Sequence, residues 1–475
     1  MSIADQIFPE RVFLMRSFHF VGVGGIGMSA LAAGAAACGF RVTGSDRGAD
    51  KPENQPLMRA LQSQGIAVFP QDGSRFSTGD KPDALVYSTA IEEDNPDFLA
   101  SGGMPRLHRS EFLRLLLDEF GKTSIAVTGS CGKSSVTAYI TEVLERAGAD
   151  PVMISGALSK RYRHPGNAGN FRDGKGNFLV FEADESDKSL LAYGADYAVI
   201  LNIGTDHYDK EELARVFREF LGSIRKGAVL SRQVADALGG DLPENLDIRI
   251  FDDLPGTSGN PYTLSEYLPG NPPEAVFGDG AALTLPASGR HTAMNALAIR
   301  ALAGMLGFAD DDVLGCLDKF DGVWRRNDFA GRTPGGTPVY DDYAHNPEKI
   351  ISCLSGMREG ISGRVFAVFQ PHGYKPFGFM QSALFGSLEN FLAPDDRFIL
   401  LEPFYAGGTS SFSPHAADVA AGWQSRSAVP ERFMVMPDRE TLKKFLLSAA
   451  GENDLIVIMG ARDNSLSLFA AELTR

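Results

Sequence analysis

Residues 124–135 read SIAVTGSCGKSS, an apolar run followed by a glycine-rich turn and a polar stretch. The run Ser124–Val127 predicts a strand buried on both faces, and the residues after the turn, to about Ala147, predict a helix. The turn matches a phosphate-binding loop one turn tighter than the usual form, because Val127 stands where the first glycine is expected. The loop residues are Gly129, Ser130, Cys131, Gly132, Lys133, Ser134 and Ser135.

The residue types in this turn suit the binding of a nucleoside triphosphate. Backbone amides cradle phosphate oxygens, Lys133 neutralises the β- and γ-phosphates, and the Ser134 hydroxyl can ligate Mg²⁺. A GKS tripeptide also arises by chance, so a structural turn is the alternative interpretation. Cys131 is interpreted as a loop residue and not as a nucleophile.

The order strand, glycine-rich loop, helix recurs along the chain and predicts doubly wound α/β domains. At roughly 150 residues per domain, 475 residues suggest three domains, which we place at 1–120, 121–328 and 329–475. Residues 239–290 are expected to form loops and short strands of the middle domain. Further strands are expected at Phe18–Val21, Arg41–Gly44, Ala84–Tyr87, Phe178–Phe181 and Tyr197–Leu201.

Another glycine loop, the first along the chain, follows the first expected strand and matches G-x-G-x-x-G. Its glycines let a backbone approach a phosphate, and Asp46 follows at the end of the next strand. The motif alone is weak, because a nicotinamide cofactor, another diphosphate-bearing ligand and a purely structural turn all remain open. The loop residues are Gly22, Gly24, Gly25 and Gly27.

Two acidic clusters follow the strands expected at Phe178–Phe181 and Tyr197–Leu201. Residues at the carboxyl ends of strands in an open α/β sheet converge on the ligand crevice, and Mg²⁺ takes oxygen ligands. We therefore predict a magnesium site there, with solvated strand caps as the alternative. The clusters are Glu182, Asp184, Glu185 and Asp187, then Asn202, Asp206, His207 and Asp209.

Composition limits the class of protein. The formal net charge of −15 argues against binding nucleic acid or a membrane surface, because both are polyanionic. Val21–Phe40 carries no charge, but its glycines favour strand, turn and helix over a membrane span. The four scattered cysteines and the lack of a signal-peptide pattern indicate a cytoplasmic protein, and we expect a monomer or homodimer.

Taken together, the motifs resemble the Mur ligases of bacterial peptidoglycan synthesis over nearly the whole chain. The segments VGVGGIGMSALA, GSD and VYSTAIEEDNP are similar to the family's UDP-sugar domain, and TGSCGKSS, EADESD and NIGTDHYD to its ATP and magnesium motifs. GRHTAMNALA, GVWRRND, DDYAHNPEKI, FQPH and MGARDN follow in the family's order. The resemblance implies three domains: a Rossmann-like UDP-sugar domain, a central P-loop-type ATPase domain and a Rossmann-like carboxy-terminal domain that binds an amino acid.

The resemblance also implies roles for individual residues. Lys133 would hold the β/γ-phosphates, with Gly129, Gly132 and Ser135 lining the loop, and Ser134, Glu182 and His207 would form the magnesium site. His291 and Asn295 would contact adenine, Arg326 the γ-phosphate, and Asp342 and His345 would face ATP and the incoming amine. Gly22, Gly24, Gly25, Gly27, Asp46, Ser88 and Thr89 would line the UDP-sugar site. Packing or surface roles remain open for His291, Asn295 and the Arg325–Arg326 pair.

The reaction implied is the ATP-dependent joining of L-alanine to the lactyl carboxylate of UDP-N-acetylmuramate through an acyl phosphate. Such chemistry depends on positioning and domain closure, and we place part of the hinge at Gly331–Gly336. Catalysis is assigned to Lys133, His207, Arg326 and His345, with ATP and Mg²⁺ as cofactors.

Departures from the family pattern leave the acceptor amine open. Thr292 and Asn327 replace expected asparagine and phenylalanine, and residues 372–375, HGYK, replace a stretch that supplies arginines. Lys375 and Arg462 are possible substitutes, although lysine lacks the bidentate fork of arginine. The alternatives are a recycling ligase that adds a preformed peptide, a nicotinamide-dependent oxidoreductase, and a non-catalytic protein of the same fold.

Overall fold

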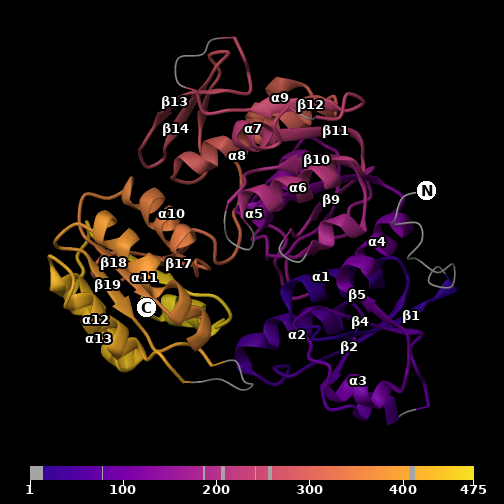
Figure 1. The fold of residues 1–475 in the computed structure, drawn as a ribbon, viewed down its shortest axis with the longest axis horizontal. Helices are drawn as coiled ribbons and strands as arrows, with labels where there is room; N and C mark the ends of the chain where they lie inside the picture. Colours follow the sequence, from indigo (N-terminus) through magenta and orange to yellow (C-terminus); the bar gives the residue numbers. More distant parts are fainter. Residues whose placement is uncertain are drawn as a thin grey trace. The chain divides into compact units, whose positions relative to one another are not determined.

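The computed structural model describes residues 14–77, 79–185, 188–204, 209–240, 242–254, 259–405 and 412–475 (Figure 1). The first sheet has five parallel strands in the order β3-β2-β1-β4-β5. The strands are β1 (Ser17–Val21), β2 (Arg41–Asp46), β3 (Ala67–Pro70), β4 (Ala84–Tyr87) and β5 (Arg106–His108). Its helices are α1 (Ile26–Ala37), α2 (Gln55–Ser63), α3 (Pro96–Ser101) and α4 (Arg109–Phe120).

The second sheet has seven strands in the order β12-β11-β10-β6-β9-β7-β8, parallel except for the β7–β8 pair. The strands are β6 (Thr123–Thr128), β7 (Val152–Ile154), β8 (Phe171–Arg172), β9 (Phe178–Glu182), β10 (Ala195–Ile200), β11 (Ile224–Ser231) and β12 (Asp247–Phe251). The helices of this part are α5 (Lys133–Arg146), α6 (Lys210–Leu221), α7 (Arg232–Ala237), α8 (Arg290–Met305) and α9 (Asp310–Leu317).

Alternate residues of the second sheet enter two different cores. Ile125 and Val127 of β6 pack with residues of α5 and α8, whereas Ala126 packs with residues of α6. Both faces of the parallel sheet are therefore covered, which explains why its strands are continuously apolar. A small sheet of β13 (Leu264–Leu268), β14 (Glu274–Phe277) and β15 (Ala282–Thr284) follows, in the region where loops and short strands were expected.

The last sheet has the order β16-β17-β21-β18-β19-β20, in which only the β16–β17 pair is antiparallel. The strands are β16 (Asp328–Arg332), β17 (Pro338–Asp342), β18 (Val365–Phe369), β19 (Arg397–Leu400), β20 (Phe433–Val435) and β21 (Leu455–Met459). Its helices are α10 (Pro347–Arg358), α11 (Tyr374–Phe391), α12 (Ala416–Gln424), α13 (Arg439–Ala449) and α14 (Ser465–Glu472).

The described chain forms two compact units. Unit 1 takes the described residues up to Tyr267, then Ala275–Pro286 and Ala293–Val323, and unit 2 takes Leu268–Glu274, Ala287–Thr292 and Trp324–Arg475. The α/β class and the strands expected from the sequence are confirmed, while the domain boundaries at 120 and 328 stay predictions. No helix in the described ranges is long and apolar enough to cross a membrane. The segment 21–40 is strand, turn and helix, as expected.

Candidate active site

The phosphate-binding loop lies between β6 and α5 at the carboxyl edge of the second sheet. Gly129 has φ of +132° and Gly132 of +90°, a region that side-chain-bearing residues rarely adopt. A Cβ on Gly129 would lie 3.1 Å from the backbone nitrogen of Asn202, so the loop has no room for a side chain there. Tight turn geometry and close packing therefore both require the glycines that the sequence places here.

Asn202, which follows β10, ties this loop down with its amide group. Its Oδ1 accepts the N–H of Cys131 at 2.8 Å, and its Nδ2 donates to the carbonyl of the same residue at 2.9 Å. Ser130 Oγ accepts the N–H of Gly204 at 2.8 Å. The loop is thus held to the strand beside it before any ligand is considered, a pre-organisation that lowers the entropy cost of binding.

Lys133 starts α5 with its ammonium group against a carboxylate. Its Nζ lies 2.8 Å from Glu185 Oε2 and donates to the carbonyl of Gly129 at 2.9 Å. Burial opposes the charge, but Glu185, Glu182 and Asp184 outweigh it and raise the pKa of Lys133. Burial raises the pKa of Glu185, and Lys133 offsets part of that shift. Lys133 is therefore a cation at neutral pH.

The strand register brings the first acidic cluster beside the phosphate loop. Glu182 pairs with Val127, and Ile200 pairs with Thr128, so β9 and β10 end on either side of the loop. Glu182 Oε2 accepts the N–H of Gly156 at 2.9 Å. Ser134 is buried and Ser135 half-buried in the first turn of α5. Asp187, Asp206 and His207 lie outside the described residues, and the ranges described contain no group of three or more potential metal-ligating side chains.

The first glycine loop lies between β1 and α1, with β2 on one side and β4 on the other. The N–H groups of Gly22 and Val23 donate to the carbonyl of Ser45. Asp46, expected to line a sugar-nucleotide site, already accepts two backbone N–H groups, from Gly24 at 2.9 Å and from Gly48 at 2.7 Å. Its carboxylate therefore stabilises the loop conformation itself.

The turn after β4 also reaches this loop. The carbonyl of Ser88 accepts the N–H of Ile91 at 3.1 Å, and Ile91 Cδ1 lies 3.1 Å from where a Cβ on Gly22 would be. Ser88 is half-buried and Thr89 is exposed within this turn. The structure thus brings the residues predicted for a UDP-sugar site to the carboxyl ends of three neighbouring strands.

A pocket within unit 1 lies between the first glycine loop and the acidic cluster at the end of β9. It is lined by Gly27 from the first glycine loop, by Glu182 and Asp184 from the acidic cluster, and by Arg109 at the start of α4. Arg109 donates to Asp184 Oδ2 at 2.7 Å and is about one-quarter exposed. A guanidinium at a pocket wall is a group that recognises an anionic ligand such as a carboxylate or a phosphate.

Unit 2 carries a second group of predicted residues at the end of β17. Asp342 accepts the N–H of Asn327 at 2.7 Å and of Ala344 at 2.8 Å, and burial raises its pKa against the effect of Arg326. The Arg326 guanidinium lies 5.0 Å from the centre of the Tyr343 ring. Arg325, by contrast, is 1% exposed and bonds Asp341 and the carbonyls of Gly460 and Asp463.

His345 is held as a neutral imidazole. Its Nδ1 lies 2.9 Å from the carbonyl of Tyr343, which fixes Nδ1 as the protonated nitrogen and leaves the Nε2 lone pair available. Burial lowers its pKa to about 4, and Lys349, His372 and Arg326 act in the same direction. The His372 ring packs edge-on against it at 5.1 Å.

The parallel strands of unit 2 end at one edge of the sheet. Residues 372–375, which depart from the expected family pattern, lie at this edge. His372 and the exposed Lys375 follow β18, the exposed Arg462 follows β21, and Glu402 follows β19. Glu402 accepts from Tyr374 Oη at 3.1 Å and contacts His415 Nδ1 at 2.7 Å.

Family models of known proteins match this chain in three consecutive segments. A model of the Mur ligase family catalytic domain matches residues 17–121, one of the Mur ligase middle domain 127–237, and one of the Mur ligase glutamate ligase domain 325–462. The UDP-N-acetylmuramate–L-alanine ligase of Methylorubrum extorquens is 33% identical over 95% of both chains. The chain belongs to the Mur ligase family.

Solved structures of other Mur ligases share this fold. The UDP-N-acetylmuramate–alanine ligase of Thermotoga maritima superposes with a TM-score of 0.77 at 25% identity, over 96% of this chain and 98% of that one. A murein peptide ligase of Psychrobacter arcticus gives 0.67 at 21% identity, over 96% and 97%, a likeness of fold alone.

One expectation for this Mur ligase changes with the structure. Gly331–Gly336 is no hinge, because Gly331 pairs with Val339 and the N–H of Gly336 donates to the carbonyl of Thr333 inside the β16–β17 hairpin. For Arg325, whose packing or surface role was left open, the structure shows a buried side chain. His291 is exposed and Asn295 half-buried on α8, and their roles stay predictions.

Sequence reasoning missed Arg109 and the separate roles of Asn202 and Glu185. Arg109 stands in no motif, so its place at the pocket could not be found without the fold. Asn202 and Glu185 were included in acidic clusters, and their position one strand away from the phosphate loop was the available signal.

Proposed function

We propose that this Mur ligase joins L-alanine to the lactyl carboxylate of UDP-N-acetylmuramate at the expense of ATP, as a step in peptidoglycan precursor synthesis. Membership of the family makes the chain an ATP-dependent, amide-bond-forming ligase. The substrates are proposed from relatives that share 31–33% identity along nearly the whole chain.

The observation that carries the proposal is the pocket lined by Gly27 of the first glycine loop and by the acidic cluster at the end of β9. Arg109 of α4 lines this pocket, together with Glu182 and Asp184 from the end of β9, the strand that pairs with β6. A substrate with a diphosphate at one end and a carboxylate at the other suits this arrangement, because the carboxylate would meet Arg109 near the phosphate loop.

The residues supply positioning and charge stabilisation. The substrate carboxylate oxygen attacks the γ-phosphorus of ATP, ADP departs, and the amine then attacks the acyl carbon and displaces phosphate. Lys133 and Arg326 are proposed to stabilise negative charge on the transferred phosphoryl group. The neutral His345 can accept a hydrogen bond from the incoming amine through Nε2 without repelling it electrostatically.

Mg²⁺ is proposed as the second cofactor. The Ser134 hydroxyl and the Glu182 carboxylate are hard oxygen donors next to the phosphate loop and suit this ion, and His207, outside the described residues, is proposed to join them. When bound, Mg²⁺ neutralises charge on the phosphate oxygens. A cytoplasmic location and a monomeric or dimeric state stay predictions.

An ADP-release assay with UDP-N-acetylmuramate tests the proposal. L-Alanine, L-serine, glycine and a preformed tripeptide are offered in parallel, each with and without the UDP-sugar. We expect release that requires both the UDP-sugar and L-alanine. Release with the tripeptide alone would instead assign the recycling reaction, and release with no acceptor in the panel would refute both substrates.

A further inference from the structure

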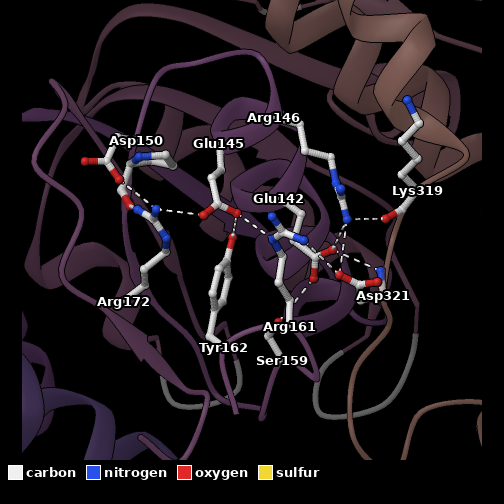
Figure 2. Close-up of polar contacts among 11 residues, drawn as sticks. Glu142, Glu145, Arg146, Asp150, Ser159, Arg161, Tyr162, Arg172, Lys319 and Asp321 are labelled. Carbon is white, nitrogen blue, oxygen red and sulfur yellow. Dashed lines mark hydrogen bonds and ion pairs between the residues drawn. The ribbon is translucent and has the colours of Figure 1, made fainter. Parts of the chain in front are cut away.

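A polar network around the carboxy-terminal half of α5 ties three segments of unit 1 together (Figure 2). Glu142 of α5 is fully buried. Its Oε2 accepts the N–H of Asp321 at 2.9 Å, and its Oε1 lies 3.2 Å from Ser159 Oγ. Asp321 belongs to the segment after α9, and Ser159 to the loop between β7 and β8.

Two arginines hold the same segment. Arg146, one turn further along α5, donates to the carbonyl of Lys319 at 2.7 Å and to Asp321 Oδ2 at 3.1 Å. Arg161 lies 3.1 Å from the same Asp321 oxygen and 2.6 Å from Glu145. Residues 319–321 are therefore held through their backbone by α5 and through the Asp321 carboxylate by two cations.

The next two residues complete the attachment. The carbonyl of Gly322 accepts the N–H of Lys160 at 3.0 Å, and Val323 forms an antiparallel bridge with Ser159. Val323 is 2% exposed in an apolar cluster that includes Ala138 of α5. Val323 is the last residue of unit 1, so the chain leaves that unit from a fixed point on the phosphate-loop helix.

The chain is fastened again almost at once in unit 2. Arg325 donates its N–H to Asp328 at 3.2 Å, its carbonyl accepts from Tyr343 at 2.8 Å, and its buried guanidinium bonds the carbonyl of Asp463 at 3.2 Å. A rotation of one unit against the other that preserves both attachments must turn the backbone between Val323 and Arg325, and also the earlier connections at 267–268, 274–275, 286–287 and 292–293.

We propose that Glu142 is a positioning residue of the ligase. It holds the segment 323–325, which we call the pivot, in place relative to the phosphate loop. Glu142 lies nine residues after Lys133 on one helix, a rise of about 13 Å. Because the helix is stiff, a displacement at the phosphate loop reaches the pivot through Glu142 and Asp321. Glu142 is not a catalytic residue, and its loss should lower kcat while leaving nucleotide affinity intact.

The experiment compares Glu142→Ala with Glu142→Gln in the full chain. The amide of Gln can accept from Asp321 N–H and donate to Ser159 Oγ, whereas Ala can do neither. For Glu142→Ala we expect amide exchange at residues 319–323 to accelerate at least about tenfold and kcat to fall about tenfold, with the Kd for ATP within about twofold of wild type. Glu142→Gln should restore both exchange and kcat.

Glu145→Ala is the matched control. It removes the same type of side chain from the same helix, one that bonds Arg161, Arg172 and Tyr162. The proposal would be overturned if Glu142→Ala and Glu145→Ala lost equal kcat at equal losses of Tm. Unchanged amide exchange at residues 319–323 in Glu142→Ala would also overturn it. So would faster exchange in Glu142→Ala with unchanged kcat.

The kinetic part rests on the proposed function, and the exchange part does not. If the wild-type chain releases no ADP with any acceptor, the substrate assignment fails. The exchange comparison then still decides whether Glu142 holds the segment, and unchanged exchange would refute that independently.

Discussion

Lys133 remains charged because three carboxylates compensate for its burial. Replacement of Lys133 by alanine should lower kcat/KM for ATP about 10³-fold, equivalent to about 4 kcal/mol of transition-state stabilisation. Binding of UDP-N-acetylmuramate, measured by calorimetry, should persist. The exposed Lys175, paired with Asp173, provides the control substitution, and equal losses in the two variants would contradict the assigned role.

Arg109 should recognise the UDP-sugar and not the nucleotide. Arg109→Ala is expected to raise the KM for UDP-N-acetylmuramate about 30-fold, which corresponds to about 2 kcal/mol, with the KM for ATP nearly unchanged. Steady-state kinetics with each substrate varied in turn would check this. Arg106 lies three residues before Arg109 and pairs with Glu93. The control substitution Arg106→Ala should change neither KM. A rise confined to the KM for ATP would refute the role.

Glu142 makes stability depend on pH. Burial raises its pKa to about 7, although the N–H of Asp321 favours the charged form. The native state thus holds this proton more tightly than the unfolded state, with its ordinary pKa of about 4.3, so the stabilisation present at low pH is lost as pH rises through 7.

The Glu142→Gln variant isolates this effect because Gln does not titrate. The free energy of unfolding of the wild type, relative to that variant, should fall by about 2–3 kcal/mol between pH 5 and pH 8. Urea denaturation at a series of pH values measures it. Parallel stability curves for the two proteins would show that Glu142 titrates normally.

At the scale of elements, the phosphate loop depends on its neighbour β10 as much as on its own glycines. Asn202→Ala removes both side-chain bonds to Cys131, so the loop must pay more ordering entropy on binding. We expect the Kd for ATP to rise about tenfold, by about 1.4 kcal/mol. Asp438→Ala removes the cap of α13 and serves as the control, with a similar loss of stability but an unchanged Kd. Equal Kd values for Asn202→Ala and wild type would count against pre-organisation.

The strands around the loops were predictable because continuous apolar runs and glycine loops are local signals. β1, β2, β4, β6 and β9 contain the segments expected from the sequence, and β10 covers its expected segment except for Leu201. The carboxyl ends of β9 and β10 meet the phosphate loop as parallel-sheet topology requires. The function of Arg109 was not predictable, because one arginine in a polar stretch gives no signal before the fold brings α4 to the pocket.

The adjacent arginines show a second limit. Arg325 and Arg326 both lie over the Tyr343 ring, yet Arg325 is fully buried and Arg326 is only half-buried. Arg325 has φ of +57°, a backbone conformation that is uncommon for residues other than glycine and that the sequence pattern does not reveal. The turn Thr333–Gly336 was interpreted as a hinge for a related reason. Hairpin turns and interdomain linkers are both rich in proline and glycine, so composition does not distinguish them.

For the whole molecule, we expect the short path between the attachments at Val323 and Arg325, one of several connections between the two units, to couple them. Insertion of Gly-Ser after Val323 should lower kcat at least about tenfold while the Kd for ATP stays constant, because the pivot is no longer fixed. The same insertion after Pro334, in the β16–β17 hairpin, should leave kcat near wild type. If the hairpin insertion were the more damaging of the two, the hinge would have to be returned to that segment.

The bonding of Asp46 bears on how glycine fingerprints are interpreted across α/β proteins. In enzymes that use nicotinamide dinucleotides, the acid after the second strand binds a ribose hydroxyl. Here each oxygen of that carboxyl already accepts a backbone amide, from Gly24 and from Gly48. A pattern search that scores glycines plus a downstream acid would class this loop with dehydrogenases, although here both oxygens of the acid also hold the turn that carries the glycines.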